Sequence, residues 1–165
     1  MTMKKVVLIF SALFLMTGVF AQGTLPDVTV KTLDGENVKL DAIVKKGKIT
    51  VLNFWATWCN PCKKELDVIK DMYEEWKELY DIEFIAISID NAGTMKKVKP
   101  MVAQKQWEYT VFTDEQGDLM RALNFQTIPQ TFLFDADRKI VYSHNGYNAG
   151  DEFELEDQIK KAAGK

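Results

Sequence analysis

The sequence predicts an α/β domain in which a mixed central β-sheet is flanked by helices on both faces. Two patterns predict this fold class. Apolar runs of strand length alternate with segments of helical periodicity through most of the chain, an order typical of strands joined by helices. The chain then continues as two short strands around a polar turn, followed by one more helix. The hairpin adds antiparallel pairing, so the sheet is expected to be mixed.

The first elements are a hairpin and a buried strand. Val28 to Leu33 and Val38 to Leu40 alternate apolar and polar residues around the turn Asp34-Gly35, which predicts a β-hairpin. The apolar run Ile49 to Trp55 then predicts a central strand, because a strand that is covered on both faces has no polar alternation.

A long amphipathic helix follows that strand, from Pro61 to Tyr80. Its apolar residues recur at helical spacing and leave an outer face rich in lysine and glutamate; they are Leu66, Ile69, Tyr73, Trp76 and Tyr80. Pro61 suits the first turn, where the missing N–H has no partner to lose.

The middle of the chain predicts a second strand, a helix, a short strand and a short helix. Ile82 to Ile89 is again unbroken in its apolar character, which predicts a strand covered on both sides. The remaining segments are a helix over Thr94 to Gln106 with a break or bend near Pro100, a strand over Tyr109 to Thr113 and a helix over Asp118 to Leu123.

The C-terminal part predicts the antiparallel hairpin and the last helix. Thr131 to Phe134 and Lys139 to Ser143 flank the polar turn Asp135-Ala136-Asp137-Arg138. Asp151 to Ala163 is acidic in its first turn and basic in its last, as the helix dipole favours.

The first 21 residues predict a secretory signal peptide. Lys4 and Lys5 form a positive start, Val6 to Phe20 form a short apolar core, and Val19-Phe20-Ala21 offers small residues for cleavage. The apolar core is shorter than the ~20 residues that a membrane-spanning helix needs, so an uncleaved anchor is the weaker alternative. We therefore expect residues 22–165 to form one exported domain that begins at Gln22 and is soluble after cleavage, in the periplasm or another extracytoplasmic space.

The charge of the chain argues against nucleic acid as a partner. The whole sequence has 21 basic and 24 acidic residues and a net charge of −3. Removing Lys4 and Lys5 with the signal peptide makes it about −5, and no basic patch interleaved with aromatic residues is present. Export would also place the protein where disulfides persist.

The only two cysteines, Cys59 and Cys62, lie between the apolar strand and the long helix. Cys59 is placed at the helix N-terminus, where free N–H groups and the helix dipole favour a thiolate. The pair could cycle between dithiol and disulfide, bind a metal or form an inert bridge. A bridge that closes so short a loop stabilises a domain little. A metal site lacks ligands, because His144, expected on the surface of a strand, is the only histidine.

Two motifs in this order resemble the thioredoxin superfamily. They are Phe54-Trp55-Ala56-Thr57-Trp58-Cys59-Asn60-Pro61-Cys62-Lys63 and, far downstream, Thr127-Ile128-Pro129-Gln130-Thr131-Phe132. The N-terminal hairpin and the helix-strand insertion between Asn91 and Asp114 resemble the exported TlpA/ResA-like branch. The resemblance covers the mature chain and implies a thioredoxin-like fold and thiol-disulfide oxidoreductase activity.

The resemblance implies roles for three residues of the site. Cys59 is expected to attack a substrate disulfide as a thiolate whose pKa is lowered by the helix end and by the lysines that follow Cys62, and Cys62 to resolve the mixed disulfide. Thioredoxin proper has a buried aspartate where Asn53 stands, and Asn53 does not titrate. Glu65, one helical turn after Cys62, matches a glutamate of ResA-like proteins and is the candidate proton acceptor, with a pKa raised by burial.

The docking surface is expected from Trp58, Ile128 and Pro129. The motif implies a cis Pro129 that presents the Ile128 backbone beside Cys59, where a substrate segment could pair as an added strand. Trp58 would shield Cys59, while Trp55 belongs to the core and Trp76 and Trp107 serve packing alone.

Taken together, the sequence predicts an exported reductant of disulfide-containing proteins. It needs no bound cofactor, binds no metal and would be recharged by a membrane thiol donor. Three alternatives stay open: an exported disulfide oxidase of the same fold, a thiol peroxidase and a non-enzymatic metal-binding or redox-inert module. The peroxidase alternative would require a proline-containing loop before the cysteine, and Phe54 to Trp58 contains no proline.

Overall fold

A computed structural model describes residues 25–165 of the chain. The expected signal peptide, residues 1–21, and the expected start at Gln22 lie outside the described residues. Over residues 25–165, no helix has both the length and the apolar character needed to cross a bilayer.

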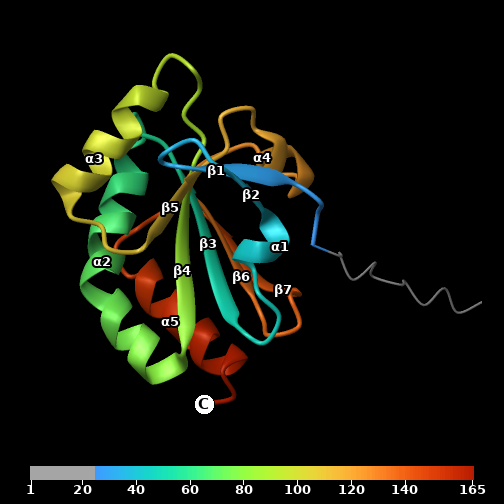
Figure 1. Cartoon of the computed structure of the whole chain (residues 1–165). Coiled ribbons are helices and arrows are strands. Elements are labelled where there is room, and N and C mark those ends of the chain that lie inside the picture. The colour runs from blue at the N-terminus through green and yellow to red at the C-terminus, as the bar shows by residue number, and fades with distance from the viewer. Residues whose placement is uncertain (1–24) are drawn as a thin grey trace, which may run out of the picture.

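A seven-stranded mixed sheet forms the centre of the molecule (Figure 1), with the strand order β2-β1-β5-β4-β3-β6-β7. The strands are β1 (Thr29–Thr32), β2 (Asn37–Lys39), β3 (Ile49–Trp55), β4 (Ile82–Ser88), β5 (Thr110–Thr113), β6 (Gln130–Phe134) and β7 (Ile140–Asn145). The central three, β3, β4 and β5, are parallel to one another, and every other pairing is antiparallel. The predicted mixed sheet and both predicted hairpins are therefore confirmed.

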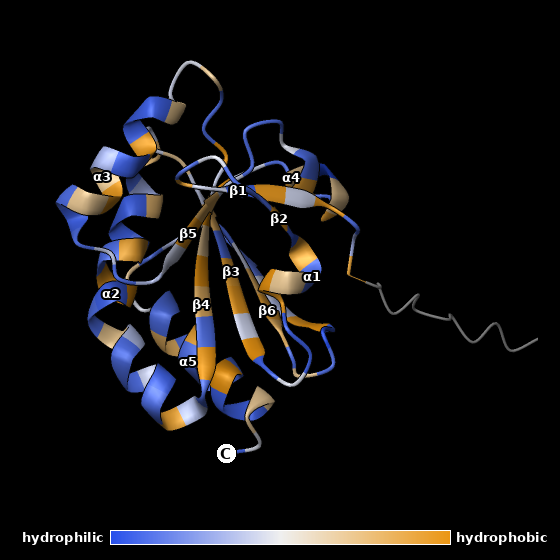
Figure 2. Ribbon diagram, in the orientation of Figure 1, coloured by the Kyte–Doolittle hydropathy of each residue, from blue (hydrophilic) through white to orange (hydrophobic). Residues whose placement is uncertain are grey.

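Helices cover both faces of the sheet (Figure 1). They are α1 (Leu40–Ile43), α2 (Asn60–Tyr80), α3 (Val98–Lys105), α4 (Asp118–Ala122) and α5 (Asp151–Ala162), with a 3₁₀ turn over Met95–Lys97 before α3. One core cluster joins α2, α3 and α5 to one face, and a second joins α1 and α4 to the other. The inner strands are mostly apolar and the outer helix surfaces mostly polar (Figure 2).

All seven residues of β3 are buried, and its alternation assigns each side chain to a face. Val51 and Trp55 belong to the α2 cluster, whereas Leu52 and Phe54 belong to the opposite one. Asn53 lies between Val51 and Trp55 in this alternation. This polar residue therefore points to the α2 face, toward the helix that carries the cysteines.

The long helix α2 follows its prediction closely. The five apolar residues that predicted its inner face are all at most 8% exposed. The helix begins with Cys59 as N-cap and Pro61 in its first turn, and it ends at Asp81 in the left-handed conformation. The burial of its apolar stripe fixes the rotation of the helix and so directs its first turn toward the sheet.

Two local details differ from the sequence prediction. The expected bend near Pro100 occurs before the proline, where the 3₁₀ turn gives way to α3 at Val98. Pro100 is the third residue of α3, a position whose N–H has no helical partner, so it starts the helix without breaking it. Helix α1 was not predicted, because four residues are too short to show a period; Leu40 and Ile43, one turn apart, are both buried.

Candidate redox active site

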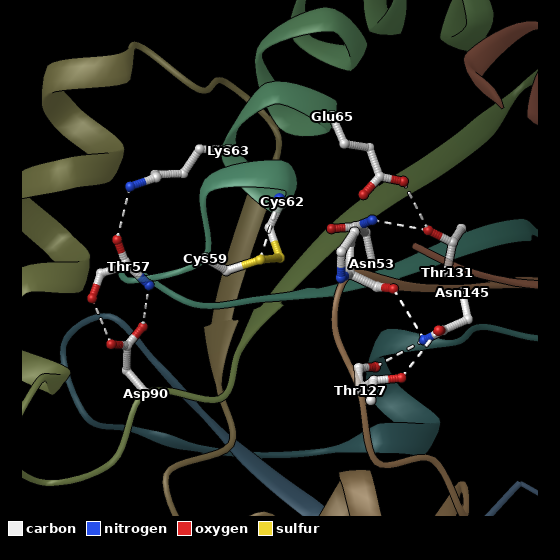
Figure 3. The surroundings of a disulfide bond; sticks show 11 residues. Asn53, Thr57, Cys59, Cys62, Lys63, Glu65, Asp90, Thr127, Thr131 and Asn145 are labelled. Atoms are coloured by element: carbon white, nitrogen blue, oxygen red, sulfur yellow. Dashed lines mark hydrogen bonds between the residues drawn. A yellow bond between two sulfur atoms is a disulfide. The ribbon is translucent and has the colours of Figure 1, made fainter. Parts of the chain in front are cut away.

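A disulfide joins Cys59 and Cys62 at the N-terminus of α2, with an S–S distance of 2.00 Å (Figure 3). The Cys59 sulfur also accepts a hydrogen bond from the backbone N–H of Cys62 at 3.3 Å. Cys59 is 5% exposed and Cys62 is fully buried. Cys59, the residue expected to attack, is the more exposed of the two, although in this oxidised form it is nearly covered. The helix N-terminus would stabilise a thiolate on Cys59 after reduction.

A buried carboxylate, Asp90, holds the loop that precedes the cysteines. Its Oδ2 accepts from the Thr57 backbone N–H at 2.8 Å and from Ser88 Oγ at 2.8 Å, and its Oδ1 accepts from Thr57 Oγ1 at 2.6 Å. Asp90 has no exposed surface. The Lys63 ammonium donates to the Thr57 carbonyl at 3.1 Å. The same loop is thus fixed from β4 on one side and from α2 on the other.

Sequence reasoning missed Asp90 and Ser88. The signal that could have found them is their place directly at the end of a buried strand that runs parallel to β3. Because parallel strands end at the same edge of a sheet, polar residues at the end of β4 lie beside the Cys59 loop at the end of β3.

The two tryptophans next to the motif lie in opposite environments. Trp58 is 59% exposed, whereas Trp55 is fully buried and packs edge-to-face on Trp107 with ring centroids 4.9 Å apart. The core roles predicted for Trp55, Trp76 and Trp107 are confirmed, since the latter two are at most 5% exposed. Trp58 is a large apolar side chain that faces solvent next to the disulfide.

The peptide bond between Ile128 and Pro129 is cis, as predicted. Pro129 is buried and directly precedes β6. Since Gln130 pairs with Phe54 in the antiparallel β3–β6 register, the proline lies beside the end of β3 that leads to the cysteines. Ile128 is half-buried and contacts both core clusters, so its side chain anchors the segment.

One residue that sequence reasoning missed, Asn145, ties down the proline segment (Figure 3). Its Nδ2 donates to the backbone carbonyls of Thr127 at 3.0 Å and of Pro129 at 3.3 Å, and its Oδ1 accepts from Thr127 Oγ1 at 3.0 Å. Asn145 is the last residue of β7, so no local pattern in the sequence connects it with a segment 16 residues earlier.

Glu65 is 5% exposed and points from α2 toward the sheet. Its Oε1 accepts from Thr131 Oγ1 at 3.2 Å, and Thr131 Oγ1 in turn accepts from Asn53 Nδ2 at 2.9 Å. Burial raises the pKa of the Glu65 carboxyl to about 7, and the neighbouring Asn53 amide and the hydrogen bond from Thr131 oppose that rise. The expected burial and the expected direction of the pKa change are both present.

Two polar atoms beside the disulfide lack hydrogen-bond partners among residues 25–165. They are Glu65 Oε2 and Asn53 Oδ1. Figure 3 shows Asn53 and Glu65 on one side of the disulfide and Thr57 with Asp90 on the other. Unpaired buried oxygens are uncommon, so these two atoms mark a polar spot on the α2 side of the disulfide.

His144 lies in a strand as expected, but its side chain is half-buried and not on the open surface. It is 29% exposed, and its Nε2 lies 3.1 Å from Asp151 Oδ2 at the start of α5. Within the described part of the chain, no group of three or more histidine, cysteine or acidic side chains is arranged to hold a metal ion.

The model of the AhpC/TSA family matches residues 21–143 of this chain. The chain belongs to the AhpC/TSA family. Within this thioredoxin-like family, the thiol-disulfide oxidoreductase ResA of Bacillus thuringiensis subsp. konkukian is 33% identical over 136 residues, which cover 82% of this chain and 75% of that protein. The predicted resemblance to the ResA-like branch is confirmed, and the AhpC/TSA member described here is a thiol-disulfide oxidoreductase.

Solved structures agree with the fold of this chain. An uncharacterized thioredoxin-like protein from Porphyromonas gingivalis superimposes with a TM-score of 0.75 at 38% identity, covering 85% of this chain and 92% of that one. A putative thiol:disulfide interchange protein DsbE from Chlorobium tepidum gives 0.73 at 28% identity, covering 84% and 94%. The predicted thioredoxin-like fold is therefore confirmed.

Proposed function

We propose that the protein is an exported thiol-disulfide oxidoreductase that reduces disulfides in protein substrates. The observation that carries this proposal is the buried Glu65, whose pKa is about 7, on the α2 face behind the Cys59–Cys62 disulfide. A carboxyl group poised near neutral pH suits a step in which a buried thiol must lose its proton. The fully buried Cys62 is the thiol that needs such an acceptor.

The reaction begins with the reduced protein. The Cys59 thiolate attacks one sulfur of the substrate disulfide, forming a mixed disulfide and releasing the other substrate sulfur as a thiolate that takes a proton from water. Glu65 then accepts the proton of the Cys62 thiol. The Cys62 thiolate attacks Cys59, the Cys59–substrate bond breaks, and the second substrate sulfur leaves with the electron pair. The protein is left with the Cys59–Cys62 disulfide and a protonated Glu65.

Substrate docking is assigned to Trp58, Ile128 and Pro129. Trp58 offers an exposed apolar surface next to the disulfide. The cis proline segment lies beside the end of β3 and is fixed by Asn145. An extended substrate segment can add to such a backbone as a strand. After each turnover a membrane thiol donor would reduce the disulfide again, without a bound cofactor.

Export rests on the N-terminal sequence. The positive start, the apolar core and Ala21 favour removal of residues 1–21. Mass spectrometry of protein recovered from the producing cell should give a chain that begins at Gln22. Recovery of the full-length chain in the membrane fraction would contradict the assignment.

Trapping of substrates tests the roles of the two cysteines. The Cys62→Ala variant should accumulate mixed disulfides through Cys59, because the intermediate has no intramolecular exit. The Cys59→Ala variant is the matched control and should accumulate none. Equal trapping by both variants would contradict the assigned order of attack.

The direction of electron flow distinguishes the reductant from the oxidase of the same fold. Reduction potentials of thioredoxin-fold proteins spread over ~150 mV. Equilibration with glutathione buffers should place this couple near the reducing end of that range. A potential at the oxidising end, together with oxidation of reduced substrates by the disulfide form, would favour the oxidase.

A further inference from the structure

A row of polar side chains leads from behind the disulfide to the edge of the sheet. Asn53 on β3 pairs with Thr131 on β6, and Thr131 pairs with His144 on β7. Residues that are directly opposite in a sheet lie on the same face. Glu65, on α2 above this face, accepts a hydrogen bond from Thr131 (Figure 3).

The row ends at a small pocket that Glu65 shares with His144. The pocket has a volume of about 10 Å³, and its lining includes Glu65, Thr131, Tyr142, His144, Asp151 and Glu152. Such a space holds about one water molecule. At its outer end the side chains of His144 and Asp151 are 29% and 23% exposed. The pocket therefore connects a nearly inaccessible carboxyl group with a half-exposed imidazole.

The catalytic cycle requires such a connection. After resolution Glu65 holds the former Cys62 proton, but it is only 5% exposed. Its Oε1 is engaged by Thr131, and Oε2 has no hydrogen-bond partner within the described residues. The proton has to reach solvent before Glu65 can act again.

We infer that His144, paired with Asp151, is the proton-exchange partner through which Glu65 returns its proton to solvent, an inference that rests on the proposed role of Glu65. The Glu65 O–H bond breaks and, across one water in the shared pocket, an N–H bond forms on the neutral imidazole. The imidazolium is stabilised by the Asp151 carboxylate and then releases the proton to bulk water. The cycle ends with an ionised Glu65 and a neutral His144, and no electron is moved.

The charges around the pocket are consistent with this direction. A protonated His144 lowers the pKa of Glu65, while Asp151 raises it. A hydrogen bond from the Asn148 backbone is the first of the contacts that lower the pKa of Asp151, and the hydrogen bond from His144 adds to it. Asp151 is therefore held as the carboxylate that an imidazolium needs beside it.

The other titratable groups that face the pocket do not replace His144. Burial raises the pKa values of Tyr142 and Tyr147 to about 12, so both stay protonated at neutral pH. Glu152 accepts hydrogen bonds from the Tyr147 hydroxyl and the Gly150 N–H, and Glu154 interacts with Tyr142. Among side chains, imidazole is the one suited to both take up and release a proton near neutral pH.

The first test uses the single histidine of the chain. The ring-proton NMR signals of His144 in the untagged oxidised protein should report the ionisation of Glu65 as an inflection near pH 7. In Glu65→Gln this inflection should be absent. An identical pH dependence of the His144 signals in the two proteins would overturn the inference.

The second test measures the rate of disulfide reduction over repeated cycles at low buffer concentration. His144→Gln keeps an amide donor for Asp151 but does not titrate. Its rate over repeated cycles should fall about tenfold, less than the ~10²–10⁴ expected for loss of the direct acceptor. The loss should be recovered as the concentration of imidazole buffer rises, which a purely structural defect would not show. Ser143→Ala, the exposed neighbour on β7, is the matched control.

The outcomes separate this inference from the proposed function. In one outcome, Glu65→Gln turns over slowly while His144→Gln keeps the parent rate at every buffer concentration. That result would support Glu65 as the proton acceptor and overturn the role of His144. Normal rates in both variants would contradict the role of Glu65 itself, and the inference with it.

Discussion

Two buried carboxylates, Glu65 and Asp90, flank the disulfide, and their hydrogen-bond partners suit them to different tasks. Asp90 accepts three hydrogen bonds, two from Thr57 and one from Ser88. Glu65 accepts from Thr131 through Oε1, and its second oxygen is unpaired within the described residues. A well-satisfied carboxylate holds a loop in place, whereas a poorly satisfied one can gain a proton at little cost.

The position of the Cys59 loop should depend on Asp90. In Asp90→Asn one carboxylate oxygen is replaced by an NH₂ group. That group cannot accept a hydrogen bond from Thr57 or Ser88, so at least one buried hydrogen bond is lost. We expect the free energy of unfolding to fall by about 1–3 kcal/mol and the rate of Cys59 alkylation in the reduced protein to change. Denaturant unfolding and alkylation kinetics check both.

The control for that substitution is Asp71→Asn, an exposed aspartate on α2, which should behave like the parent protein. An Asp90→Asn variant with unchanged stability and unchanged Cys59 reactivity would show that the network around Thr57 does not position the loop.

At the scale of elements, the sequence predicted what depends on local patterns. The predicted bounds of β3 and α2 agree with the structure almost residue for residue. They came from the apolar run Ile49 to Trp55 and from the apolar stripe of the long helix, because burial on one or both faces imposes a pattern on the sequence. The family resemblance then placed Glu65 and the cis Pro129 correctly in the structure. Helix α1 was not predicted because a single turn shows no helical period.

What the sequence could not predict depends on register between distant strands. The contact of Asn53 with Thr131 spans 78 residues, and the place of His144 beside them follows from a second strand pairing. A shift of one residue in either pairing would turn these side chains to the other face. The polar row behind the disulfide is thus a property of the assembled sheet, and no segment of the sequence contains it.

At the scale of the whole molecule, Glu65 should make folding stability depend on pH. Its folded pKa of about 7 lies above the ordinary glutamate pKa of 4.5, so between those values the folded state binds more protons than the unfolded state. Stability should therefore decrease as pH rises through this window, by on the order of 3 kcal/mol in total. Denaturant unfolding of the oxidised protein below and above the window measures the effect.

In Glu65→Gln the same comparison should lack this decrease, since the amide does not titrate. The difference between the two proteins isolates Glu65 from the surface carboxylates, which contribute equally to both. Parallel stability curves for the parent and the variant would contradict a raised pKa at Glu65.

The most direct measurement of the central claim is the rate of the resolving step as a function of pH. A mixed disulfide on Cys59, formed with a small aromatic thiol, releases that thiol when Cys62 attacks. In the parent protein the rate should rise through about pH 7 as Glu65 becomes ionised. In Glu65→Gln it should be slower by roughly 10²–10⁴ and should lose that inflection. The control Glu75→Gln, on the exposed face of α2, should follow the parent. A Glu65→Gln profile that matches the parent in rate and in pH dependence would contradict the account.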